Sequence, residues 1–273
     1  MKSLRIIAFP VIGLILLAVL VYHFLNREMA SPAPSGPPAL RVWADPALRL
    51  PLESPDMEHE HGLLGRFQRR SGVRAQVTYG TLVQWETETA AHAEIDLILT
   101  ADRQWKQWLV DNEMLDDETP FARHVPVILM HEGSHSEGDL LAFLRNPDLR
   151  LGAGDLHGTT LGQLTAEWLT DDTYAMDDLQ RQVRYMAGQA DDVARAVEQH
   201  RVDAAIVWRD TALRHARRTV YESWPDPDVE GPNVYALLLA TGPQKREAAQ
   251  LMRFLAGPAA RDLLEAYGFG TVD

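Results

Sequence analysis

The chain has 273 residues, of which 46% are hydrophobic, so it can form one large domain or two lobes that each bury a core. The formal net charge of −13 is spread along the chain, which argues against a nucleic-acid partner. There are no cysteines, which excludes disulfides, thiolate metal sites, a thiol nucleophile and a lipid-modified N-terminal cysteine. An anionic ligand would be opposed by the overall charge, so its capture would depend on local donors such as helix N-termini.

The first segment is apolar and follows a basic start. Lys2 and Arg5 precede a nearly continuous apolar run over residues 6–25, and about 20 such residues span a bilayer as a helix. The positive-inside rule then keeps the N-terminus in the cytoplasm. A cleaved signal peptide is the alternative, but its apolar core is usually only about 7–15 residues long, and no clean cleavage site follows here. We therefore expect a single-pass anchor over residues 1–27.

A proline-rich linker over residues 28–39 comes next. Residues 31–38 read SPAPSGPP, a composition that favours an extended chain and would hold the folded part away from the membrane. The folded part would lie in the periplasm or on the extracytoplasmic face of the cell membrane.

From residue 40 onward, strand and helix patterns alternate. Expected strands cover residues 40–44, 73–79, 95–101, 125–130, 149–151, 204–208 and 233–240. Expected helices cover residues 62–70, 83–91, 102–113, 140–144, 160–169, 191–199, 245–255 and 258–267. Because strand and helix follow one another in turn, the pattern predicts an α/β protein with a parallel, doubly wound sheet.

The sequence His131-Glu132-Gly133-Ser134-His135 fits the H-E-x-x-H pattern of zinc peptidases. In such enzymes the two histidines act from one face of a helix. Here an apolar, β-branched strand pattern precedes the motif, and glycine and serine within it favour a turn. A solvated loop is therefore the preferred interpretation, and a zinc hydrolase is the alternative.

A second group, Met57, His59 and His61, offers side chains that can bind copper or zinc. Its alternate spacing on a polar, acidic stretch is more typical of a surface segment. No serine lies on a G-x-S-x-G elbow, and no phosphate-binding P-loop is present. We expect no metal, no cofactor and no enzymatic activity.

Four strand-to-helix turns could receive an anion, since ligands of open α/β sheets bind beyond the carboxyl ends of the strands. They cover residues 44–48, 79–82, 154–162 and 208–211. Each turn taken alone is also compatible with an ordinary connection between a strand and a helix.

Taken in order, these turns and their neighbours resemble the periplasmic molybdate-binding proteins of ABC importers. The resemblance lies in VWA at residues 42–44 with Ala47-Leu48, DLILTADRQW at 96–105, FARHVPVIL at 121–129, Gly154-Asp155, TLG at 160–162, Asp192-Val193, DAAIVW at 203–208, and the closing FL at 254–255 and YGF at 267–269. It implies a two-lobed type II solute-binding fold. Lobe 1 would comprise residues 40–122 plus 241–273, and lobe 2 residues 123–240.

The resemblance also implies a ligand site, in which hydroxyl groups and backbone amides hold an oxyanion without metal. Carried over by position, the site residues are Ala47, Thr81, Leu161, Val193 and Trp208. The amides of Leu161 and Val193 would donate whatever their side chains. Ala47 and Trp208 stand where the family has a serine and a tyrosine, and each lost hydroxyl would cost about 1.5–3 kcal/mol against a buried anion.

Neighbouring residues bear on this site as well. Asp45 would repel an anion if it faced the ligand, and residues 50–60 form a stretch long enough to cap the cleft. Trp105 and Trp108 are expected to pack within a lobe rather than contact the ligand, and the role of Trp85 stays open.

We therefore expect a membrane-tethered, monomeric solute-binding protein. It would capture a small oxyanion such as molybdate, tungstate or sulfate and deliver it to an ABC permease or another inner-membrane protein. A tethered sensor or assembly module with altered or lost oxyanion binding is the alternative.

Overall fold

The structure is a computed structural model that describes residues 39–53, 62–80, 84–85, 94–131, 139–224 and 231–272. These residues belong to one compact unit, Ala39–Asp273. Within them no helix is both long enough and apolar enough to cross a membrane. The predicted anchor and linker lie outside the described residues.

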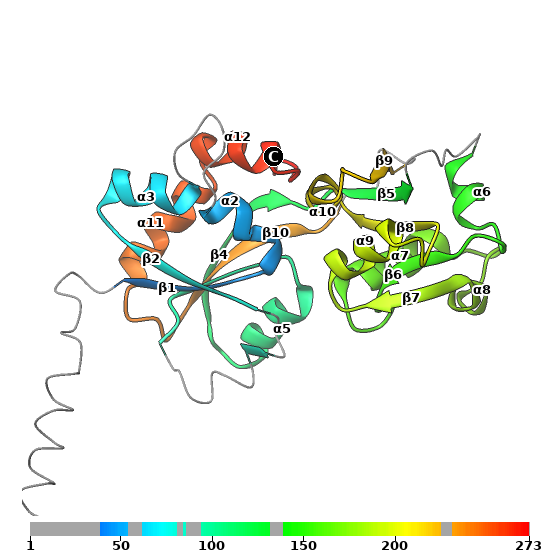
Figure 1. The fold of residues 1–273 in the computed structure, drawn as a ribbon. Coiled ribbons are helices and arrows are strands. Elements are labelled where there is room, and N and C mark those ends of the chain that lie inside the picture. Colours follow the sequence, from blue (N-terminus) through cyan, green and yellow to red (C-terminus); the bar gives the residue numbers. More distant parts are fainter. Residues whose placement is uncertain are drawn as a thin grey trace, which may run out of the picture. The chain divides into compact units, whose positions relative to one another are not determined.

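The first lobe is built on a five-stranded sheet in the order β2-β1-β3-β10-β4 (Figure 1). Its strands are β1 (Leu40–Ala44), β2 (Ala75–Tyr79), β3 (Leu97–Thr100), β4 (Leu115–Arg123) and β10 (Asn233–Leu239). Its helices are η1 (Pro46–Leu48), α2 (Arg49–Glu53), α3 (Leu63–Ser71), α5 (Arg103–Asp111), α11 (Lys245–Leu255) and α12 (Pro258–Ala266). Strands β1, β2 and β3 are parallel, whereas β10 runs antiparallel to β3 and β4.

The second lobe repeats this plan with the sheet order β7-β6-β8-β5-β9. Its strands are β5 (Pro126–His131), β6 (Leu151–Gly154), β7 (Val183–Ala187), β8 (Ala204–Trp208) and β9 (Thr219–Ser223). Its helices are α6 (Leu140–Leu144), α7 (Thr160–Leu169), α8 (Met176–Gln182), α9 (Ala190–Glu198) and α10 (Arg209–Arg214). Here β5 runs antiparallel to both β8 and β9.

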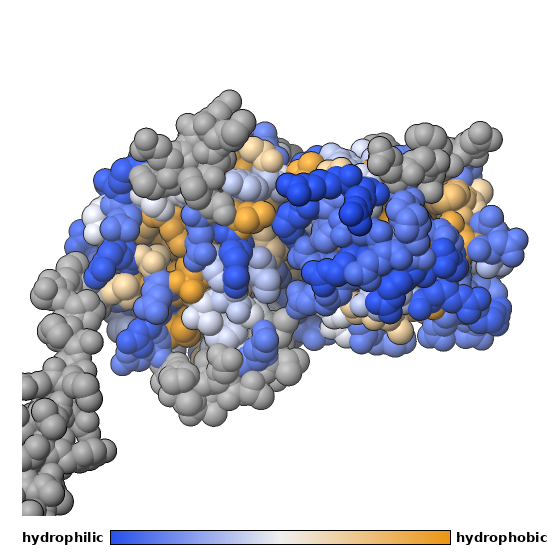
Figure 2. Space-filling view, viewed as in Figure 1, coloured by the Kyte–Doolittle hydropathy of each residue, from blue (hydrophilic) through white to orange (hydrophobic). Residues whose placement is uncertain are grey.

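Both sheets are covered on both faces, because alternate strand residues enter different cores. In β8, Ala204 and Ile206 pack with α7, whereas Ala205 and Val207 pack with α9. In Figure 2, hydrophilic side chains cover most of the visible face of the second lobe. The alternation fixes each strand in register, and this in turn fixes where the loops at its carboxyl end lie.

The expectation of parallel sheets is wrong for β5 and β10, which run antiparallel to their neighbours. The predicted lobe boundary also assigned residues 233–240 to the second lobe, whereas β10 pairs with β3 and β4 of the first sheet. The reason is that the second crossing of the chain lies before β10, at residues 231–232, and not after it. The two crossing segments lie side by side, because the His124 amide donates to the Pro232 carbonyl oxygen at 3.0 Å, and at Gly231 a Cβ atom would overlap the His124 carbonyl oxygen.

Candidate functional site

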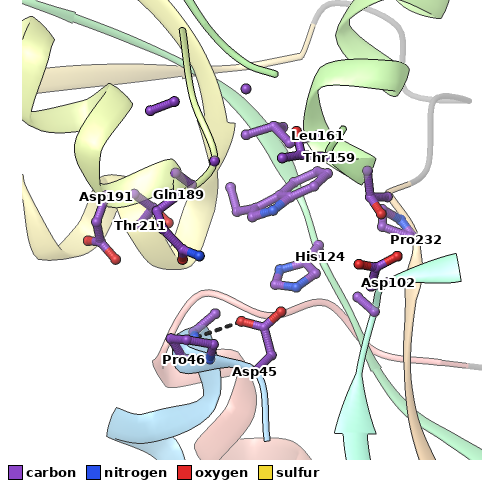
Figure 3. Close-up of a pocket in the computed structure, with 18 of the residues that line it drawn as sticks. Asp45, Pro46, Asp102, His124, Thr159, Leu161, Gln189, Asp191, Thr211 and Pro232 are labelled. Carbon is purple, nitrogen blue, oxygen red and sulfur yellow. Dashed lines mark hydrogen bonds between the residues drawn. The ribbon is translucent and has the colours of Figure 1, made fainter. Parts of the chain in front are cut away.

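A cavity of about 350 Å³ lies between the lobes. The first lobe lines it with the turns that follow β1 and β3, and the second lobe with the starts of α7 and α9 and the end of β8. His124 and Pro232, from the two crossings, complete the wall (Figure 3). Small-ligand pockets have volumes of about 300–1,000 Å³. The cavity is therefore the candidate solute-binding site.

Three of the five predicted site residues, Ala47, Leu161 and Trp208, line this cavity. Val193 does not line it: its side chain is fully buried in the core of the second lobe, and its amide donates to the Gln189 carbonyl oxygen at 3.3 Å. Thr81 lies outside the described residues. The structure therefore places the predicted turns at one cavity, but it does not place Val193 there.

On the second lobe, the start of α7 presents free backbone donors to the cavity. Thr159 caps this helix, and its hydroxyl oxygen accepts from the Gly162 amide at 3.0 Å. The amides of Thr160 and Leu161, the two residues before Gly162, have no hydrogen-bond partner among the described residues, as is usual for the first amides of a helix. They can therefore donate to a bound anion, which the helix dipole also favours.

The start of α9 makes a second donor group. The Gln189 carbonyl oxygen accepts from the Asp192 and Val193 amides, so the helix uses both. The unused donors are the Ala190 and Asp191 amides, and both residues line the cavity. The sequence-based assignment of the donor to Val193 was therefore late by two to three residues, because it was carried over by position from the resembling family and not from the predicted helix start at residue 191.

The Asp191 carboxylate is paired within its own lobe. Arg214 contacts it at 3.0 Å and His215 at 3.1 Å. Burial raises the pKa of Asp191, but the hydrogen bonds and positive charges of His215 and Arg214 outweigh this effect and lower it to about 2. The second lobe therefore presents free amides to the cavity, while the Asp191 carboxylate, which also lines it, is paired with Arg214 and His215.

The first lobe has similar turns, but its own carboxylates occupy their donors. Asp45 accepts from the Ala47 amide at 2.9 Å, as the dashed line in Figure 3 shows. Asp102 caps α5 and accepts from the Gln104 amide at 2.8 Å. Both carboxylates line the cavity, and within the described part of the chain neither has a lysine or arginine within 4.0 Å. At each of these turns a carboxylate of the protein itself thus accepts the hydrogen bond that a bound anion would otherwise accept.

Burial governs the charge of both carboxylates. Desolvation raises the pKa of Asp45, and the nearby His124 and the Ala47 amide oppose this rise. Desolvation likewise raises the pKa of Asp102, against hydrogen bonds from the Gln104 and Trp105 amides. An anionic group at these turns would oppose ionisation of both carboxyls, whereas a cationic group would favour their ionised forms.

A buried polar group lies at the back of the cavity, where the chain crosses between the lobes. His124 stacks on Trp208 with ring centroids 4.8 Å apart, and its Nδ1 lies 3.4 Å from Asp210 Oδ1 without hydrogen-bond alignment. Asp210 also accepts from Arg214 at 2.8 Å. Burial raises the pKa of Asp210, but His124 and Arg214 outweigh this effect, so its pKa is lowered. Trp208 therefore covers the buried contact between His124 and Asp210.

The tryptophans of the first lobe form a packed cluster, as expected for Trp105 and Trp108, although Trp105 also lines the cavity, which was not expected. Trp85 lies edge-on to Trp105 and Trp108, with ring centroids 5.5 and 5.3 Å away. Trp105 also contacts Trp43 at 6.4 Å and lines the cavity beside Asp102. Packing thus fixes an aromatic side chain at the edge of the site.

The two candidate metal motifs fall mostly outside the described residues. His131 is the last residue of β5, which is a strand and not the helix that a zinc peptidase motif requires, whereas Glu132 and His135 lie outside the described ranges. Met57, His59 and His61 also lie outside them, as do residues 54–60 of the predicted cap. Across the described ranges no group of three or more metal-binding side chains comes together.

The sequence matches the model of the bacterial extracellular solute-binding proteins over residues 61–270. The chain belongs to this family. Its members are binding proteins rather than enzymes, which confirms the class predicted from the sequence. No curated protein sequence matches the chain.

Solved structures of several binding proteins share the fold. The periplasmic molybdate-binding protein of Azotobacter vinelandii is 17% identical, with a TM-score of 0.63 and coverage of 86% of this chain and 100% of that one. Iron-bound HitA from Pseudomonas aeruginosa is 16% identical, with a TM-score of 0.63 and 84% coverage of both chains. The sulfate-binding protein SubI from Mycobacterium tuberculosis is 15% identical, with a TM-score of 0.62 and 86% coverage of both chains. At these identities the likeness shows the fold alone.

Sequence reasoning missed several residues of this site. Asp102 stood within a quoted motif but was not interpreted as a cavity residue, and its position as the first residue before a helix was the available signal. Asp210 and Arg214 lie four residues apart on α10, so a helical pattern could have indicated their ion pair. His124 meets Asp210 only through the fold, and no local pattern predicts that contact.

Proposed function

We propose that this chain captures a small anionic solute between its lobes and delivers it to an ABC permease. The observation that carries this proposal is the pair of helix N-termini on the second lobe. The free amides of Thr160 and Leu161 in α7 and of Ala190 and Asp191 in α9 line one cavity. Two converging helix N-termini favour an anion through both their donors and their dipoles.

Small oxyanions such as molybdate, tungstate and sulfate are the first candidates. Support comes from the resemblance of the sequence to molybdate-binding proteins and from the molybdate- and sulfate-binding proteins that share the fold. Closure of the lobes around the solute would then create the form that the permease recognises. The protein would act as a monomer without a cofactor.

The test is a binding titration on the full chain in detergent, with intrinsic tryptophan fluorescence as the readout. Trp105 and Trp208 line the cavity, so occupancy should change their emission. Thermal unfolding is the second readout, since a solute at 100 times its Kd should stabilise the protein by about 2.7 kcal/mol. Failure of every small solute that carries an anionic group, in both assays, would contradict the proposal.

A tethered sensor or assembly module is the second candidate. It is favoured by the contacts in the first lobe, where the Asp45 and Asp102 carboxylates already accept hydrogen bonds from the backbone amides of the two turns. If the cavity takes no solute, this module becomes the better account. A crosslinked membrane partner that copurifies with the chain irrespective of added anions would support it.

We further infer that residues 6–25 anchor the protein in the membrane and that residues 28–39 act as a tether. The length of the apolar run supports this inference. Full-length protein should remain with membranes after carbonate extraction and keep its N-terminus. Recovery of a soluble form that begins within the linker would overturn the anchor.

A further inference from the structure

The two walls of the cavity differ in charge. The second lobe offers amide donors from α7 and α9, and its carboxylate Asp191 is already paired with Arg214 and His215. The first lobe offers the carboxylates of Asp45 and Asp102, whose hydrogen bonds come from backbone amides. One wall therefore suits an anion, and the other suits a cation.

We propose that the preferred solute is a small zwitterion. Its anionic group lies at the N-termini of α7 and α9, and its cationic group lies against Asp45 and Asp102. This inference rests on the proposed function and names the class of solute that the same cavity takes.

The surroundings of Asp45 and Asp102 support a cationic group at the first lobe. Trp105 lies three residues after Asp102 on the same helix and lines the cavity, and indole rings attract ammonium groups within about 6 Å. An ammonium group donates several hydrogen bonds and accepts none, so it matches two carboxylates that have free acceptor capacity. A charge-assisted hydrogen bond is stronger than a neutral one.

The protein itself compensates the charges of Asp45 and Asp102 only in part, because the basic side chain near Asp45, His124, also contacts Asp210. His124 is only 3% exposed, lines the cavity, and its Nδ1 has no hydrogen-bond partner in the described part of the chain. Its nearest acid is Asp210, at 3.4 Å, and Asp210 also holds Arg214. Asp45 therefore shares the His124 imidazole with Asp210. Among the described residues, no basic side chain lies within ion-pair distance of Asp102.

The cavity has room for two charged groups. Its volume of about 350 Å³ lies within the usual range of about 300–1,000 Å³ for small-ligand pockets. A tetrahedral oxyanion has only five heavy atoms. A solute with an anionic head, a two-carbon spacer and an ammonium group fills the space better and contacts both walls at once.

The experiment uses matched pairs of probes that differ only in the ammonium group. They are 2-aminoethylphosphonate with ethylphosphonate, taurine with ethanesulfonate, and β-alanine with propionate. Each is titrated against the full chain by tryptophan fluorescence and by calorimetry, alongside molybdate, sulfate and ethylammonium. In at least one pair the aminated member should bind at least tenfold more tightly than its partner.

The variant Asp45→Asn/Asp102→Asn tests which wall is responsible. Asparagine caps turns and helices about as well as aspartate, so the backbone contacts of both residues survive, which circular dichroism and thermal unfolding check. The tenfold preference for the aminated probe should disappear in this variant. Asp139→Asn is the matched control, because Asp139 caps α6 by the same contact, at 2.9 Å from the Leu141 amide, and does not line the cavity.

The possible outcomes separate the two proposals. Equal or tighter binding of every deaminated probe, with a gain for all anions in the double variant, overturns the zwitterion and leaves anion capture standing. Binding of ethylammonium as tight as that of any zwitterion overturns both, because the anion would then contribute nothing. Absence of binding by every probe, in the wild type and the double variant alike, also overturns both.

Discussion

Both lobes have the same local structure at the cavity, but its backbone amides bind side chains in the first lobe and are free in the second. In each lobe a strand ends, the chain turns, and the first amides of a helix or helical turn become available. In the first lobe Asp45 and Asp102 occupy those amides with their own carboxylates. In the second lobe the amides of Thr160, Leu161 and Ala190 are left for a ligand.

The difference shows that a fold supplies a place for a ligand but does not specify its charge. Bound carboxylates turn a donor site into an acceptor site without moving the backbone. Counter-charges have the reverse effect on Asp191, since Arg214, which also lines the cavity, and His215 compensate its negative charge. The following substitutions alter one wall at a time, from the largest expected effect to the smallest.

Arg214→Met should cause the largest loss. Arg214 bridges Asp191 and the buried Asp210, which is 2% exposed. Removing one partner of a buried ion pair costs about 3–5 kcal/mol because it leaves a charge uncompensated. Chemical denaturation should show a loss of about 3 kcal/mol, and anions should bind more weakly because Asp191 is then less well neutralised.

The control is Arg217→Met, which removes an exposed arginine a few residues later and should change stability by less than about 0.5 kcal/mol. The second variant Arg214→Met/Asp210→Asn should recover part of the lost stability. If Arg214→Met and Arg217→Met behave alike, Arg214 does not compensate Asp210.

Gly162→Ala should have the next largest effect, and it acts on the donor wall alone. A Cβ atom at Gly162 would overlap the carbonyl oxygen of Asp155, so the start of α7 must shift. Overpacking of this kind typically costs about 1–3 kcal/mol. Unfolding should show such a loss, and anion binding should weaken more than tenfold, since the Thr160 and Leu161 amides move with the helix.

Gly188→Ala is the matched control, because a Cβ atom there meets no other atom within 4 Å, although Gly188 also lines the cavity. Its unfolding free energy should stay within about 0.5 kcal/mol of the wild type. Equal losses at the two glycines would show that close packing at α7 is not what holds the donors in place.

Much of this fold could be predicted from the sequence, because local pattern determined it. The runs that became β1, β3, β5 and β8 are apolar and β-branched, and the terminal helices have a clear apolar face. Strand β4 was missed because its DDET and Pro120 read as a turn, whereas tertiary pairing with β10 holds it in the sheet. Strands β7 and β9 were missed for a similar reason, since each lies at a sheet edge and alternates with exposed residues.

The site was predictable only in part. The turns at Ala47, Leu161 and Trp208 could be found because strand ends converge at one edge of each sheet. The free backbone amides could not be identified from the sequence. They depend on the residue at which α9 begins, which is Ala190, and on the contacts of single carboxylates. The pairing of Asp191 with Arg214 joins residues 23 positions apart, so it emerges only when α9 packs against α10.

Asp45→Asn should have a smaller effect, of opposite sign. Burial raises the pKa of Asp45, against the charge of His124 and with help from Asp210 and Asp102. A carboxyl group with a raised pKa binds its proton more tightly in the folded state, so the wild type loses stability as pH rises from the ordinary value through the raised one. The variant lacks this loss and should be more stable by about 1 kcal/mol at pH 7, a few degrees in Tm.

The gain should shrink toward zero near pH 4, where the wild-type carboxyl holds its proton. Thermal unfolding of both proteins across this range checks the prediction, with Asp139→Asn as the exposed control. A gain in stability that is the same at both pH values would mean that burial does not destabilise the ionised form of Asp45.

His215→Gln should have the smallest effect, and it tests the neutralisation of Asp191. Hydrogen bonds that His215 donates to Asp191 and Glu198 raise the pKa of His215, against its desolvation. Stability from this contact is therefore complete below the ordinary histidine pKa of about 6.5 and is lost as pH rises through the raised value. Because Asp191 is 43% exposed, such a pair is worth only about 0.5 kcal/mol. The variant should be less stable by that amount near pH 5.5 and equal to the wild type near pH 9, as urea unfolding would show.

Arg195→Gln is the matched control, since Arg195 pairs with Asp192 on the same helix at 2.8 Å and keeps its charge throughout, so its effect should not vary over this range. If both variants show the same dependence on pH, His215 does not neutralise Asp191, and Arg214 alone keeps the second wall open to an anion.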